Sequence, residues 1–379
     1  MRLLSNYLAY SITLFVTFIL LAPNTSEAVY CSDCFSWDCG CDSPSSEEVI
    51  SYVDPLQYQN KNNECCGRKD NETSCDQNCC FWGYFDLLHW KVLQGETDFV
   101  VTKVPTSTSI NGGNVGQIGD IENTEFEWAT GFRLGGVVCL DCNWDLELNY
   151  TNYSASGCKV INAKDGCYLN ATFEEINDTV LTKAKSDISL DYRLWNLLAA
   201  KKIYVDPCLD MRLTMGLTCV RLDQDWDFSY YGGSRNDYEL SWRYSGVGIR
   251  GGVDAVWAYC GNWSFIGKFS TALFCGDYKN KGKMIVSNGT QTSAANGYDY
   301  KLSDCRLVPH YQLAIGPQYT VDCWGWPITA YALYELNAYQ NIHYVFQSEF
   351  GVPSDAKESR HTNSLTGFHG VTLGLFFEF

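Results

Sequence analysis

The chain has 379 residues, and its 44 acidic and 27 basic residues give a formal net charge of −17. This acidity excludes nucleic acid as an expected partner, because phosphate binding needs a basic surface. Charged residues make up 19% of the chain and aromatic residues 15%, and such a profile is typical of barrels with aromatic girdles and an apolar outer belt.

The first 28 residues are interpreted as an export signal. Arg2 provides a positive start, an apolar run covers residues 12–22, and Ser26-Glu27-Ala28 is a small-x-small cleavage site. The alternative is a membrane anchor, but the run is shorter than the ~20 residues that a spanning helix needs. We therefore expect a mature chain that begins at Val29.

Residues 29–80 form a polar, Cys-rich segment for which we predict no large core of its own. The disulfide candidates in it are Cys31, Cys34, Cys39, Cys41, Cys65, Cys66, Cys75, Cys79 and Cys80. An exported chain meets an oxidising compartment, so disulfides are the expected state, and the zinc or redox-active alternatives for Cys31 to Cys41 are less favoured. The chain has 19 cysteines, an odd number, which favours a bond to a second copy or to another Cys-rich envelope protein. Internal pairing within the segment is an equally open alternative.

From Phe81 onward the sequence alternates between apolar and polar residues with the period of a β-strand. Residues 126–134 and 144–150 are separated by a short turn and predict a hairpin with its apolar side outward. The same alternation returns in residues 188–194, 209–217, 238–244 and 265–273. We expect the large apolar side chains of all these strands to face outward and the polar ones to face inward.

The fold class predicted for residues 81–379 is all-β, a transmembrane antiparallel β-barrel. Short turns alternate with long polar loops, as in membrane barrels, which favours this fold over a soluble sandwich. If each strand takes ~10 residues, about 12 strands fit, with 10 to 16 possible. At the low end of this range, side chains would fill the lumen and the barrel would not conduct.

The chain ends on an amphipathic strand. One face of this strand carries the predicted assembly signal, which consists of Val371, Leu373, Leu375, Phe377 and Phe379. Such an apolar face on an open sheet edge would be a liability, and closure onto the first strand removes the edge. A terminal Phe on such a strand resembles the signal that outer-membrane assembly machinery reads, so this machinery and outer-membrane lipid are expected partners.

Several segments are similar to one family. Residues 81–91 (FWGYFDLLHWK) resemble the first strand of the Legionella-type major outer-membrane proteins, and residues 211–225, 244–250, 267–276 and 370–375 are similar to later strands of that family. The resemblance implies a pore-forming protein of the bacterial outer membrane. The Cys-rich segment resembles the branch found in chlamydia-related bacteria, and this implies disulfide cross-linking in the envelope.

The sequence contains no motif that indicates an enzyme. Its five histidines form no HExxH pair, and neither a GxSxG elbow nor a phosphate-binding GxxxxGK[S/T] loop is present. We expect no catalytic activity, no metal and no cofactor. A soluble secreted glycoprotein is a rival interpretation, since several Asn-x-Ser/Thr sequons occur, but some of these lie within the predicted strands.

We therefore predict a porin through which ions and small hydrophilic solutes diffuse passively. Opposed charges at a constriction would select solutes by size and charge. The predicted channel-lining residues are Glu127, Arg133, Glu147, Asp191, Arg193, Arg212, Glu239, Arg243 and Lys268. The acidic balance of the chain predicts a preference for cations. The alternative is a disulfide-cross-linked envelope protein or adhesin without transport.

Overall fold

The computed structural model describes residues 81–95, 97–105, 119–141, 143–172, 181–206, 208–233, 235–288, 291–293, 299–323, 326–348 and 359–378. The predicted signal peptide, the nine cysteines of residues 29–80 and Phe379 lie outside the described residues. In the part that is described, no helix is long and apolar enough to cross a membrane.

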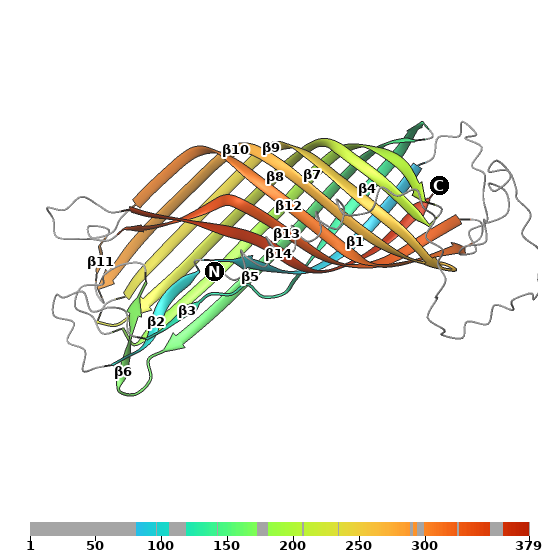
Figure 1. Cartoon of the computed structure of the whole chain (residues 1–379). Coiled ribbons are helices and arrows are strands. Elements are labelled where there is room, and N and C mark those ends of the chain that lie inside the picture. The colour runs from blue at the N-terminus through green and yellow to red at the C-terminus, as the bar shows by residue number, and fades with distance from the viewer. Residues whose placement is uncertain are drawn as a thin grey trace, which may run out of the picture. The chain divides into compact units, whose positions relative to one another are not determined.

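Ten antiparallel strands form a closed barrel (Figure 1). In their order around the barrel these strands are β1 (Phe81–Gln94), β4 (Ala129–Asp141), β5 (Trp144–Asn162), β7 (Lys183–Asp206), β8 (Leu209–Tyr231), β9 (Arg235–Cys260), β10 (Trp263–Asn288), β12 (Asp299–Cys323), β13 (Trp326–Ser348) and β14 (Ser359–Glu378). The barrel closes where β1 pairs with β14 over Trp82–Gln94, so the first and last strands cover each other's edge.

Four short strands lie outside the barrel wall. β2 (Asp98–Pro105), β3 (Asp120–Asn123) and β6 (Cys167–Ala171) form a small separate sheet, and β11 (Gln291–Ser293) pairs antiparallel with the end of β10. Figure 1 shows all four at the same end of the barrel. The small sheet packs against the barrel, since the buried Phe99 of β2 accepts a hydrogen bond at its carbonyl from the Tyr230 hydroxyl of β8.

The predicted β-barrel is confirmed, with a strand number at the low end of the predicted range. The reason is strand length. β9 and β10 each have 26 residues, whereas a strand needs only ~9–11 residues to cross a bilayer. Long strands use up the chain, so ten of them suffice where shorter ones would have made about twelve.

The two ends of the barrel differ in their connections. At one end, two residues join each of the pairs β4–β5, β7–β8, β9–β10 and β12–β13. At the other end, the connections β1–β4 and β5–β7 are long and contain the strands of the small sheet, although residues 232–234 make a short link between β8 and β9. We call these the turn end and the loop end.

The outward face of the barrel is apolar next to the turn end. Residues that stand there with large exposed fractions include Leu87, Leu134, Leu148, Trp195, Leu197, Leu213, Met215, Leu217, Val247, Ile249, Trp257, Phe265, Leu273, Ile315, Leu373 and Leu375. We call this part of the barrel the belt half. It extends from the turn end as far as Trp195 on β7, Leu217 on β8, Val247 on β9 and Leu273 on β10. Its apolar exterior matches the lipid-facing band of membrane barrels.

Beyond the belt half, the same alternate positions of each strand continue to face outward. Their side chains change from apolar to polar, and the inward side chains change from polar to apolar. On β8, the outward positions change from Leu217 to the exposed Arg221, while the inward positions become the buried Leu222 and Phe228. The same reversal occurs on β7, where Arg193 is exposed beside the apolar belt. This region, called the projecting half, has a polar exterior and an apolar interior, as in a water-soluble β-protein.

The reversal corrects the predicted orientation of two segments. We expected the apolar residues 188–194 and 238–244 to face outward. Instead Ile188, Leu190, Tyr192, Tyr238 and Tyr244 are at most 2% exposed and point into the lumen. Alternation defines the two faces of a strand but not which of them meets the surroundings. In the projecting half the surroundings suit polar side chains, so the apolar faces turn inward.

The last strand lies as the sequence predicted. Val371, Leu373 and Leu375 are exposed on the outward face of β14, and Phe377 of the same face is partly exposed. The opposite face of β14 carries the fully buried Thr372 and Phe368. The predicted assembly signal is therefore a continuous apolar stripe on the belt half as far as the structure describes it.

Candidate functional site in the barrel lumen

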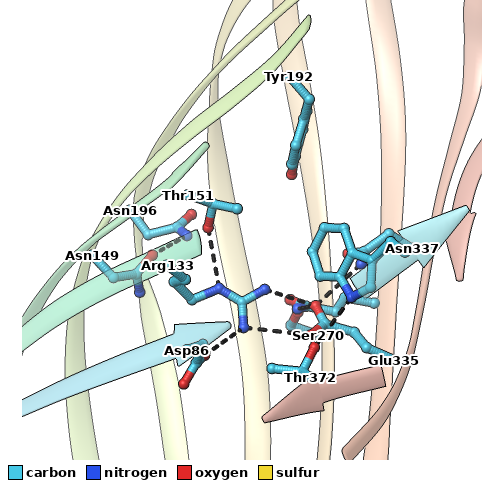
Figure 2. A network of polar contacts seen from close by, with 12 residues as sticks. Asp86, Arg133, Asn149, Thr151, Tyr192, Asn196, Ser270, Glu335, Asn337 and Thr372 are labelled. Carbon is cyan, nitrogen blue, oxygen red and sulfur yellow. Dashed lines mark hydrogen bonds and ion pairs between the residues drawn. The ribbon is translucent and has the colours of Figure 1, made fainter. Parts of the chain in front are cut away.

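The lumen of the belt half is polar and centres on Arg133 of β4. The Arg133 guanidinium donates to Asp86 of β1 at 3.0 Å and to Glu335 of β13 at 2.8 Å. Its Nε donates to the Thr151 hydroxyl at 3.1 Å. Figure 2 shows this guanidinium between the two carboxylates. Both carboxylates are almost fully buried, with exposed fractions of 2% and 0%, so Arg133 is the main source of their neutralisation.

Hydrogen bonds from other strands complete this network. Thr372 of β14 donates to Glu335 at 2.9 Å, and the Tyr331 hydroxyl of β13 donates to Asp86. Gly374 makes room for the second contact, because a Cβ there would lie 2.1 Å from the Tyr331 ring. The network therefore joins β1, β4, β13 and β14 across the place where the barrel closes.

A second network lies nearer the turn end and centres on Arg212 of β8. Its guanidinium contacts Glu147 at 2.6 Å, Asp145 at 3.2 Å and Asp254 at 3.5 Å. Glu147 also accepts hydrogen bonds from the Tyr84 hydroxyl at 2.7 Å and from the Asn149 amide at 2.9 Å. One arginine thus gathers three carboxylates, and all of them come from other strands.

A cavity of about 70 Å³ lies between the two networks. This volume has room for a few water molecules, since one needs roughly 10–15 Å³ measured in this way. The charged residues of its wall are Arg133, Glu147, Arg250, Asp254 and Lys268. Neutral polar side chains complete the wall, among them Asn149, Asn196, Thr214, Ser270 and Gln312. The cavity is a polar compartment inside the apolar belt.

Toward the loop end, an aromatic layer fills the lumen. The hydroxyls of Tyr192 on β7 and Tyr339 on β13 meet at 2.8 Å across the barrel. Phe368 packs against the Tyr192 ring at 4.8 Å between centroids, and His310 stacks on the Tyr339 ring at 4.2 Å. The side chains of Tyr192, Tyr339, Phe368 and His310 are at most 1% exposed. This layer separates the polar cavity from the rest of the projecting half.

Four of the predicted channel-lining residues lie in the lumen of the belt half. Arg133, Glu147 and Lys268 line the cavity, and Arg212 holds the second network. The sequence prediction missed their partners Asp86, Asp145, Asp254 and Glu335 and the buried Arg250. Each of these five alternates with apolar neighbours, and that pattern indicates the inward face of the strand.

The other five predicted lining residues do not line the lumen. Asp191, Arg193, Glu239 and Arg243 are exposed on the outward face of the projecting half, and Glu127 is exposed in residues 124–128, between β3 and β4. The prediction took every polar face to be an inner face. That holds in the belt half, where lipid excludes charge from the exterior, and it fails in the projecting half.

The two networks and the cavity wall contain equal numbers of carboxylates and cations. The carboxylates are Asp86, Asp145, Glu147, Asp254 and Glu335, and the cations are Arg133, Lys202, Arg212, Arg250 and Lys268. The acidic excess of the whole chain is therefore not found among these ten residues. A preference for cations consequently has no support from these lining charges.

Four cysteines of the described strands are exposed on the outside of the barrel. Cys158, Cys219, Cys275 and Cys305 are exposed on the outward face, and the sulfur atoms of Cys275 and Cys305 lie 3.7 Å apart on neighbouring strands. Within the described ranges no group of three or more His, Cys, Asp or Glu side chains is arranged to hold a metal ion. The zinc and disulfide predictions for Cys31 to Cys80 lie outside these ranges.

Taken together, a closed antiparallel barrel, an apolar outer belt and a polar lumen define a bacterial outer-membrane β-barrel protein. The chain belongs to the family of the Legionella pneumophila major outer membrane protein, whose model matches residues 85–379. The predicted family and the outer-membrane location are confirmed. No curated protein matches the chain.

Several solved outer-membrane structures are similar to the chain at low identity. The outer membrane protease OmpT from Escherichia coli has 12% identity and a TM-score of 0.44, and the match covers 79% of this chain and 97% of that one. A Pseudomonas aeruginosa FadL homologue has 7% identity and a TM-score of 0.24, with 79% and 90% covered. These values are too low to transfer any activity.

Proposed function

We propose that this outer-membrane protein is a narrow channel for inorganic ions and small hydrophilic solutes. The observation that carries the proposal is the charge-lined polar cavity inside the belt half. Ionisable groups at membrane depth are costly, and in membrane proteins they commonly mark a pathway for ions or polar solutes. The proposal is one of transport, without a catalytic step or a cofactor.

The arrangement of the lumen charges supports selection across the channel. Carboxylates gather around Arg133 and Arg212, whereas Arg250 and Lys268 face the cavity from β9 and β10. Charges of opposite sign on different sides of a lumen produce a transverse field, which orders polar solutes without binding them tightly. The ten strands keep the channel narrow.

The aromatic layer supports a restricted conductance. A solute that leaves the polar cavity toward the loop end meets the buried side chains of Tyr192, Tyr339 and Phe368. Passage requires these rings to change rotamer, which makes the layer a gate in the proposed channel. The conductance should then be far below that of wide porins with 16 to 18 strands, which leave an aqueous channel open.

Purified full-length protein in planar lipid bilayers tests the proposal. The expected result is small, discrete current steps. Substitution of Tyr339 and Phe368 together by Ala should enlarge these steps severalfold, because it removes two rings of the aromatic layer. The control is Tyr334→Ala, which removes an outward-facing ring that is 47% exposed and should leave the step size unchanged. Bilayers that stay silent with folded wild type and with the double variant would overturn the channel.

A second candidate is an envelope protein that carries no transport and is cross-linked through disulfides to its own copies or to other Cys-rich envelope proteins. The complete burial of the aromatic layer favours it, since a lumen filled by side chains suits a scaffold. It predicts silent bilayers and, on gels run without reductant, covalent multimers that disappear when reductant is added.

The proposed partners follow from the outer surface. The apolar stripe of Val371, Leu373 and Leu375 on β14 is the proposed contact with barrel-assembly machinery, and the belt half is the proposed contact with outer-membrane lipid. Substitution of Leu373 and Leu375 together by Ser should lower the amount of protein inserted in the outer membrane, measured against a Ser303→Ala control on the outward face of β12.

A further inference from the structure

The wall of the polar cavity contains a buried cation that forms no ion pair with a carboxylate among the described residues. Arg250 of β9 is 8% exposed. Its Nη2 atom donates to the Ser270 hydroxyl at 2.7 Å and to the amide oxygen of Gln312, which are both uncharged groups. Its Nη1 atom is buried and has no hydrogen-bond partner among the described residues. A buried guanidinium in this state is costly unless a counter-charge reaches it.

A second cation of the cavity is in a similar position. Lys268 of β10 lines the cavity, and its ammonium group lies 5.5 Å from the centre of the Tyr331 ring. The described part of the chain places no carboxylate oxygen within ion-pair distance of it. Arg250 and Lys268 come from neighbouring strands, so two positive charges enter the cavity from one side of the barrel.

The two carboxylates of the cavity wall are already engaged elsewhere. Glu147 receives the Arg212 guanidinium at 2.6 Å and the Tyr84 hydroxyl at 2.7 Å, and Asp254 lies 3.5 Å from the same guanidinium. The third cation of the wall, Arg133, is held by Asp86 and Glu335. The five carboxylates of the two networks face three cations, Arg133, Arg212 and Lys202, so their excess offsets the charges of Arg250 and Lys268 at longer range. Arg250 and Lys268 are the cations of the cavity wall that form no ion pair among the described residues.

We propose that the cavity binds a small monovalent inorganic anion, of which chloride is the model, between Arg250 and Lys268. Arg250 lines the cavity and supplies positive charge to it. Its Nη1 atom is closed off in this state, and a small turn of the guanidinium toward the ion would add a charge-assisted hydrogen bond. The Thr214 hydroxyl lines the same space as a neutral donor, whereas the Ser270 hydroxyl already donates to the Gln312 amide oxygen at 3.2 Å. The volume of about 70 Å³ accommodates a chloride ion with a few waters. Glu147 and Asp254 disfavour an anion with two or more charges, because the extra charge would meet their carboxylates.

This inference rests on the proposed function for its physiological meaning, but anion binding is measured without any transport. The full-length protein is purified in detergent with gluconate, an anion too large for the cavity, as the only other anion. Chloride is then added, and the line width of its NMR signal is recorded. Wild type should give a saturable broadening that bromide reverses by competition.

Variants connect the binding to the cavity. Arg250→Gln should weaken chloride binding by about tenfold or more, which corresponds to the loss of about 1.4 kcal/mol. Its matched control is Arg243→Gln, since Arg243 lies on the same strand but is exposed on the outward face, and there the affinity should be unchanged. Lys268→Met provides a second, independent removal of positive charge and should also weaken binding.

The outcomes separate the site from the channel. A wild type without saturable broadening, or an Arg250→Gln variant that binds like wild type, would overturn the site. If Arg250→Gln loses the heat-modifiable gel mobility of a folded barrel, Lys268→Met decides by the same criterion. Chloride binding together with silent bilayers would retain the site and reject the channel, and currents without binding would do the reverse.

Discussion

The belt half and the projecting half are formed by the same strands with the same alternation of inward and outward positions. The belt half buries polar side chains, whereas the projecting half buries apolar ones. In the belt half, Leu217 faces outward and Arg212 faces inward on β8. In the projecting half of the same strand, Arg221 faces outward and Phe228 inward. The phase of the strand never changes between them. The difference shows that the surroundings, lipid or water, decide which residue type each face must carry.

The two halves also differ in what holds their interiors together. The lumen of the belt half is held by two arginines that contact two and three carboxylates respectively. The interior of the projecting half is held by aromatic packing, as between Phe228 and Tyr238, whose stacked rings lie 4.7 Å apart. Substitutions in the lumen of the belt half should therefore lower the free energy of unfolding by leaving buried charges unpaired. Substitutions in the interior of the projecting half should lower it by removing packing contacts.

The largest expected effect comes from the loss of a buried arginine in the belt half. Arg133→Met leaves Asp86 and Glu335 buried without their cation, and breaking such a pair costs about 3–5 kcal/mol. Unfolding in urea, monitored by gel mobility in lipid vesicles, measures the change. The control is Arg221→Met in the projecting half. Arg221 also contacts an aspartate, Asp223 at 2.7 Å, but is 45% exposed, so its loss should cost at most about 1 kcal/mol. Equal losses at both sites would contradict the distinction between the halves.

A charge placed on the outer surface tests where lipid contact ends. Leu213→Arg puts a cation on the apolar face of β8, midway between the turn end and Leu217, and should cost about 2–4 kcal/mol if that position lies near the bilayer midplane. Ser189→Arg places the same residue on the outward face of the projecting half, opposite Asp225, and should change stability by less than about 0.5 kcal/mol. Vesicle refolding yields and unfolding curves give both values. A costly Ser189→Arg would mean that lipid also covers the projecting half.

The hydroxyl pair at the junction of the two halves should give a smaller effect. Tyr339→Phe leaves the buried Tyr192 hydroxyl without its 2.8 Å partner, and such an unsatisfied group costs about 1–3 kcal/mol. The double variant, with Phe at both positions, should be more stable than the sum of the single losses predicts, because both polar groups are then removed. Additive losses would show that the two hydroxyls do not depend on each other.

The smallest expected effect concerns an exposed contact near the loop end. Lys91 of β1 lies 2.8 Å from Glu125, whose side chain is 73% exposed. Lys91→Met should change the unfolding free energy by less than about 1 kcal/mol. In high salt the variant and the wild type should be equally stable, because salt screens the exposed ion pair. A large loss in the same urea assay would show that this contact matters for how the β1–β4 connection joins the barrel.

The amino-acid sequence by itself determined the fold class, the closing strand and the outer face of the belt half. Residues 144–150, 209–217 and 371–377 alternate so regularly that one side of each strand has to be apolar. A chain with this pattern, an apolar final strand and no spanning helix in its described part can satisfy its backbone in lipid only as a closed barrel. The similarity of residues 81–91 to a first strand agreed with the family that the match over residues 85–379 establishes.

Only the tertiary structure decided which faces of the projecting half turn inward and which charges meet. The apolar sides of Tyr192 and Tyr238 look like outward faces in the sequence, because alternation carries no information about the medium on either side. Arg133 and Glu335 are 202 positions apart and meet because β1 lies between β4 and β14 and thereby closes the ring. The cavity beside Arg250 exists for the same reason, since its wall is assembled from strands that no local pattern brings together.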